Sequence, residues 1–166
     1  MTAHASTAND VNVLAIACDN TWLHVYDDVS TLLQDDDIGV GNDAHGAMEF
    51  FDRDGRRLAP VFTHAWTLMD LAPTGEPPDP EELQGRMCAV VDHVRDYLDR
   101  HGDSAERQLS RFGLTPAAAV RQLPKIEGMK YVDSLAAFVA PTSANGDEHN
   151  GDWFHNMLHR TGWTHD

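Results

Sequence analysis

The residues whose spacing is most specific for chemistry lie near the end of the chain. Asp152, His155 and His159 are three and four positions apart, so a helix would place their side chains on one face. Imidazoles four residues apart on a helix are a common arrangement of zinc ligands. A zinc-protease site is disfavoured, because Asn156 stands where the general-base glutamate is required. The pattern fits either a zinc site or the solvent-facing side of an amphipathic helix.

The other reactive residue types form no recognisable catalytic motif. Cys18 and His24 could supply a thiol nucleophile and its base, but Cys18 lies within the apolar run at residues 13–18, and burial makes a thiol inert. We therefore expect Cys18 and Cys88 to be reduced thiols in the core. The sequence also lacks a phosphate-binding glycine loop, a Gly-x-Ser-x-Gly elbow and a complete calcium loop. An enzyme is the less favoured interpretation.

Short apolar or alternating runs predict strands in the first half of the chain, after a disordered leader at residues 1–10. Asp54-Gly55 lies between two of them and favours a tight hairpin turn. Trp22, His24 and Tyr26 alternate with Leu23 and Val25, so they should share one face of a strand, which we expect to be half-exposed. The predicted strands cover residues 13–18, 21–26, 47–52, 57–62 and 65–71.

Helices are expected in the second half. Asp79-Pro80 followed by acidic residues is typical of a helix start, and His101-Gly102 should end that helix. Further helices are predicted at residues 104–112, from Thr115 to before Pro124, and at 132–139 before Pro141. A linker at 142–151 and a terminal helix at 152–162 follow. Strands first and helices later indicate a single α+β domain at 11–166, with a mainly antiparallel sheet of about four or five strands.

The charge excludes several classes of function. The chain has 27 acidic and 12 basic residues and a net charge of −15, which argues against binding to nucleic-acid phosphates or anionic lipid. Residues 1–82 contain 16 acids and 3 bases, whereas residues 83–166 contain 11 acids and 9 bases. The excess is thus concentrated in the strand-rich half. It would serve solubility, or it would attract a basic protein.

The sequence therefore predicts a non-catalytic, acidic protein-binding module. The sharpest version is an immunity-type inhibitor that blocks the active site of a toxin or another enzyme with a basic cleft. No apolar run is long enough to span a membrane, and no secretory signal is recognisable, so a cytoplasmic location is expected. The alternative is a small metal-dependent enzyme or metal-stabilised protein that uses zinc at the terminal histidines. The candidate partner-binding residues are Trp22, His24, Tyr26, Asp35, Asp36, Asp37, Asp43, Asp52 and Asp54.

Overall fold

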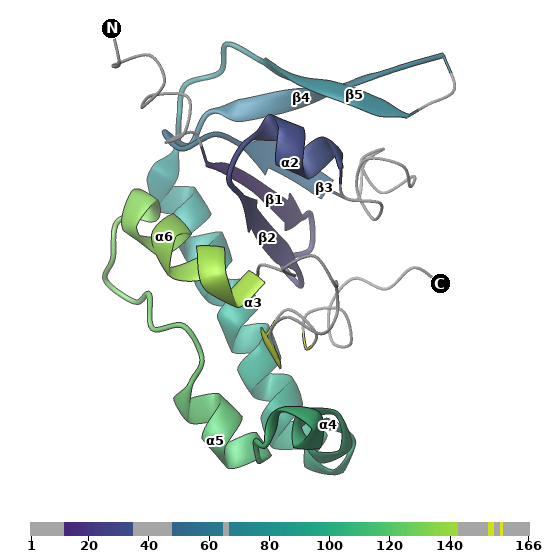
Figure 1. The fold of residues 1–166 in the computed structure, drawn as a ribbon. Coiled ribbons are helices and arrows are strands. Elements are labelled where there is room, and N and C mark those ends of the chain that lie inside the picture. The colour runs from purple at the N-terminus through teal and green to yellow at the C-terminus, as the bar shows by residue number, and fades with distance from the viewer. Residues whose placement is uncertain (1–11, 35–47, 65–66, 143–152, 155–156, 158–166) are drawn as a thin grey trace, which may run out of the picture.

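Five strands from the first half of the chain form one antiparallel sheet, in the order β2-β1-β3-β4-β5 (Figure 1). The computed structural model describes residues 12–34, 48–64, 67–142, 153–154 and 157. The strands are β1 (Val13–Ala17), β2 (Leu23–Tyr26), β3 (Met48–Phe51), β4 (Arg57–Phe62) and β5 (Leu68–Pro73). The predicted α+β domain with an antiparallel sheet is confirmed.

Helices account for the second half of the described chain. The long helix α3 (Pro80–Arg100) begins at Asp79, whose side chain accepts a hydrogen bond from the Glu82 backbone amide. Its buried residues Leu83, Met87, Val90, Val94 and Leu98 recur at intervals of three or four positions and form one apolar stripe. After α3 the described chain forms α4 (Gly102–Leu109), the 3-10 turn η3 (Ser110–Phe112), α5 (Pro116–Arg121) and α6 (Tyr131–Thr142). The short helix α2 (Val29–Leu33) lies in the first half, between β2 and β3.

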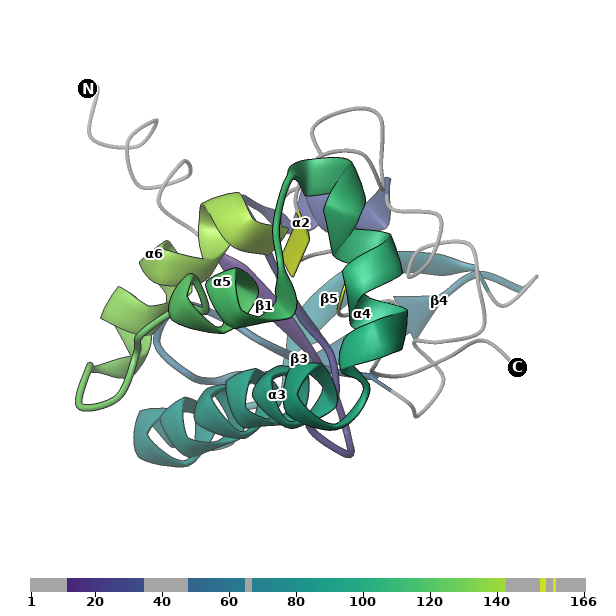
Figure 2. The same ribbon diagram turned by 90° about the horizontal axis from the view of Figure 1, so that it is seen from below.

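The sheet is covered on both faces. Figures 1 and 2 show α2 and α3 on opposite sides of the strands, and α6 packs against both β2 and α3. All five residues of β1 are buried, as expected for an inner strand covered on both faces. In the strand register, Leu14 and Ile16 lie opposite Phe51 and Glu49, so these four side chains share the α3 face.

Several sequence-based boundaries differ from the structure. The last strand begins at Leu68 rather than at residue 65, and the helix predicted at 104–112 consists of α4 followed by η3. Helix α6 was expected to end before Pro141 but extends to Thr142. A proline removes one helical hydrogen bond, and at the end of a helix this loss does not stop the preceding turn from forming.

The hairpin between β3 and β4 packs against the start of α3. The Asp79 amide donates to the Gly55 carbonyl at 3.4 Å. Gly55 has a φ of +90°, and a Cβ atom there would lie 3.2 Å from both N and Cα of Pro80. Glycine is therefore required at this turn both by its backbone conformation and by the close approach. This contact brings residues 52–57 and 76–82 together on the surface.

Candidate functional site

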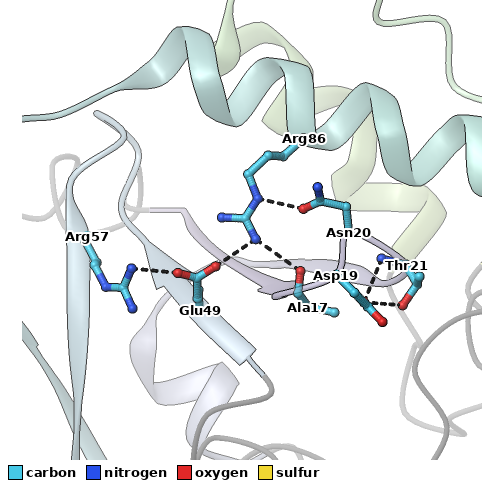
Figure 3. Close-up of polar contacts among 7 residues, drawn as sticks. All are labelled: Ala17, Asp19, Asn20, Thr21, Glu49, Arg57 and Arg86. Carbon is cyan, nitrogen blue, oxygen red and sulfur yellow. Dashed lines mark hydrogen bonds and ion pairs between the residues drawn. The ribbon is translucent and has the colours of Figure 1, made fainter.

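Arg86 connects α3 to β1, to β3 and to the turn between β1 and β2 (Figure 3). Its Nε donates to Oδ1 of Asn20 at 2.7 Å, and its Nη2 donates to the Ala17 carbonyl at 3.1 Å. Nη2 also lies 2.8 Å from Oε1 of Glu49. The second oxygen of Glu49 accepts a hydrogen bond from Nη1 of Arg57 at 2.6 Å. Glu49 on β3 thus bridges two guanidinium groups, one on α3 and one on β4.

The end of β1 and the turn that follows it present two of the three groups that Arg86 binds. The Asn20 amide donates to the Ala17 carbonyl at 2.9 Å, and Asn20 has a φ of +60°. This left-handed conformation is one that asparagine adopts more readily than most residues. Asp19 accepts hydrogen bonds from the backbone amide and the hydroxyl of Thr21. Side-chain hydrogen bonds on both sides therefore hold the turn in place.

The ionic network is largely shielded from solvent. The side chains of Arg86 and Glu49 are only 14% and 18% exposed, and the Arg86 guanidinium lies 5.9 Å from the centroid of the Phe51 ring. Both carboxylate oxygens of Glu49 are bound to cations, so this carboxylate is poorly placed to act as a general base. We conclude that the arrangement joins the helix to the sheet and holds the β1–β2 turn.

Cys18 adjoins this network and differs from the prediction. We expected a buried thiol, but Cys18 is exposed, because β1 ends at Ala17 and the residue belongs to the turn. Partial burial of the thiol and the nearby Glu49 carboxylate raise its pKa. The thiol is consequently protonated at neutral pH and is a poor nucleophile. Cys88 is half-buried, and burial likewise raises the pKa of its thiol.

Two cavities flank the contact between Gly55 and Pro80. The smaller, of about 240 Å³, adjoins the Arg86 network and is lined by charged residues that include Glu76, Asp79 and Glu82. The larger, of about 580 Å³, lies between the β3–β4 turn and the starts of α3 and α6. Two basic side chains, Arg53 and Lys130, and two acidic side chains, Asp54 and Glu81, contribute to its lining.

Of the predicted acidic site residues, the structure describes Asp52 and Asp54. Asp52 is half-buried, and its side chain accepts hydrogen bonds at 2.9 Å from the amides of Asp54 and Arg56. This carboxylate therefore shapes the hairpin turn. Asp54 is exposed and lies 3.2 Å from Arg56. The other predicted residues, Asp35, Asp36, Asp37 and Asp43, lie outside the described residues.

The prediction of a half-exposed aromatic face at Trp22, His24 and Tyr26 is wrong. Trp22, His24 and Tyr26 are 1%, 7% and 3% exposed, and the rings of His24 and Tyr26 stack at a centroid distance of 4.1 Å. By register, His24 and Tyr26 share a face with Ala15 and Val13 of the inner strand. That face forms part of the core, so these side chains cannot reach a partner in this conformation.

Sequence reasoning missed the acidic residues around the start of α3. Glu76, Asp79, Glu81 and Glu82 are all exposed. In the sequence, the pattern at Asp79, Glu81 and Glu82 indicates only the start of a helix. Their proximity to Asp54 depends on the contact between Gly55 and Pro80, which no local pattern reveals.

The proposed zinc ligands Asp152, His155 and His159 lie outside the described residues, so this hypothesis stays a prediction. Within the part of the chain that the structure describes, no group of three or more His, Cys, Asp or Glu side chains could hold a metal ion.

None of the described helices is long and apolar enough to cross a membrane. Comparisons with protein-family models, curated proteins and solved structures gave no match.

Proposed function

We propose that this protein is an acidic binding module for a basic protein, and most specifically an immunity-type inhibitor that blocks the basic active site of a toxin. The supporting observation is the asymmetric charge, a net −13 within residues 1–82. Eight of the eleven acidic residues described in that half are exposed: Asp19, Asp27, Asp54, Asp70, Glu76, Asp79, Glu81 and Glu82. A field of one sign attracts an oppositely charged partner and accelerates its association.

The partner-binding surface in this proposal is the acidic ridge, defined as Asp54, Glu76, Asp79, Glu81 and Glu82. Asp54 precedes Gly55 and Asp79 precedes Pro80, so these two acids lie on opposite sides of the contact that joins the β3–β4 turn to α3. Acidic residues in the first turn of a helix also interact favourably with the helix dipole, which accounts for Asp79, Glu81 and Glu82. It does not account for Asp54 or Glu76, which lie outside the helix.

A cytoplasmic location is part of this proposal, and the two free cysteines are compatible with a reducing compartment. The inhibitor would then meet its target in the cell that makes both proteins. Candidate targets are products of adjacent genes that carry a toxin domain. The first test is co-expression with such a product, followed by light scattering of the purified complex. We expect a 1:1 complex in which the activity of the toxin is blocked.

A matched pair of charge-reversal variants tests the role of the acidic ridge. The triple variant Asp54→Lys, Glu76→Lys and Glu81→Lys changes the ridge, whereas Asp99→Lys, Glu106→Lys and Glu127→Lys changes exposed acids on or near the helices. Three reversals of two charge units each bring both variants from −15 to −9. We expect the ridge variant to weaken binding at least about tenfold, mainly through slower association, and the control by about twofold at most.

Circular dichroism on both variants would verify that the fold is retained. Equal losses of affinity in the two variants would show that net charge alone matters and that the ridge is not the binding surface. The absence of any 1:1 complex with toxin-domain products of adjacent genes would contradict the inhibitor proposal itself.

A further inference from the structure

We draw no further inference here: the strongest candidate, the cavity of about 580 Å³ between the β3–β4 turn and the starts of α3 and α6, is lined by two basic and two acidic side chains, so its charge selects no class of ligand, and nothing in the structure shows what covers it.

Discussion

Arg86 shows how a single side chain can be central to a fold and still escape sequence reasoning. Its hydrogen-bond partners Asn20 and Ala17 are 66 and 69 positions away in the chain. In the sequence, Arg86 precedes the apolar-stripe residue Met87, where an arginine normally faces solvent. No local pattern identifies a guanidinium that is bound by a distant turn and a distant strand. The turn itself was predictable, because Asp19-Asn20 is typical turn chemistry.

Replacing Arg86 with alanine should destabilise the protein by about 2 kcal/mol. Among the described residues, the change leaves the largely buried Glu49 with Arg57 as its one cationic partner, and it removes the donors to Asn20 and Ala17. A buried pair that loses one partner costs several kcal/mol, and partial exposure reduces that cost. The free energy of unfolding, measured by urea denaturation, provides the test.

Arg95→Ala is the matched control on the same helix. Arg95 pairs with Asp92 at 2.6 Å, but these side chains are 38% and 69% exposed, so its loss should cost less than about 0.5 kcal/mol. If the two alanine variants were equally stable, the network around Arg86 would contribute no more than a surface ion pair.

Tyr131 leads to a prediction that depends on pH. Its hydroxyl donates to the Asp52 carbonyl at 2.8 Å, and burial, followed by the nearby Asp52 and Asp54 charges, raises its pKa above the ordinary value of 10.0. The folded state therefore favours the protonated phenol. Its contribution to stability is complete below pH 10 and is lost as the pH rises above that value, because only the unfolded chain then ionises readily.

Tyr131→Phe should cost about 1 kcal/mol at pH 7, since one hydrogen bond to a carbonyl is lost. This difference from the wild type should shrink by about 0.4 kcal/mol at pH 10 and further at higher pH. Urea denaturation of both proteins between about pH 7 and 10.5 measures it. A difference that does not vary with pH would mean that Tyr131 ionises equally easily in both states.

The strands and helices themselves were predictable wherever their determinants are local. The apolar run at residues 13–18, the Asp54-Gly55 turn and the four-and-three spacing along α3 each identify an element without tertiary information. The sequence could not show which elements cover one another. Helix α6, which lies far along the chain, packs on β2 and thereby helps to enclose a strand whose alternating aromatic residues suggested an open face.

The β5 edge of the sheet has two features that oppose pairing with another strand. The Thr74 amide donates to the Arg57 carbonyl, which makes Arg57 and Thr74 a hydrogen-bonded pair. The register places Leu58 opposite Pro73, one position from this pair, and Pro60 opposite Leu71, three positions from it. Because hydrogen-bonded and non-bonded pairs alternate, the backbone nitrogens of Leu71 and Pro73 both point outward. The Leu71 amide is occupied by Oδ1 of Asp70 at 2.8 Å, and Pro73 has no amide hydrogen, so neither offers a free donor.

A double variant, Asp70→Ser and Pro73→Val, should leave the outward-facing backbone amides of residues 71 and 73 free to bind another strand. It should therefore promote self-association through β5. Repulsion between chains of charge −15 opposes this, so we expect a concentration-dependent increase in mass at about 0.5 M NaCl, where surface charges are screened. Sedimentation velocity provides the measurement. Pro60→Val is the control, because the amide that it creates faces the interior of the sheet rather than its open edge. Purely monomeric behaviour of the double variant would show that these residues do not protect the edge.

For the molecule as a whole, the sequence predicted the α+β architecture and the location of the charge, but not the composition of the core. The aromatic residues of β2 were assigned to a surface, yet they lie inside. From the sequence alone, the apolar residues of the terminal helix predicted at 152–162 fit either a tail that docks on another protein or a part of the core. Phe154 and Met157 are each 1% exposed, and Phe154 lies 5.9 Å from Phe138 of α6. The described part of that segment therefore completes the core.

Phe154→Ala should accordingly destabilise the whole domain by about 3 kcal/mol, as expected when a fully buried aromatic ring is removed. Trp153→Ala is a suitable comparison, because the neighbouring Trp153 is only partly buried, and we expect it to cost less. Thermal unfolding followed by circular dichroism would measure both. An unchanged unfolding midpoint for Phe154→Ala would indicate that the segment is a separate tail after all.

The order of elements along the chain has a consequence during synthesis. All five described strands are complete by Pro73, whereas the helix that covers the Leu14 and Ile16 face begins at Pro80. A ribosome thus releases the sheet-forming residues before their cover, and apolar strand surface that waits uncovered is prone to aggregation. The same first half carries nearly all of the excess negative charge. Repulsion between neighbouring nascent chains would keep the uncovered apolar surface of one chain from contacting that of the next until α3 has emerged and packed onto it.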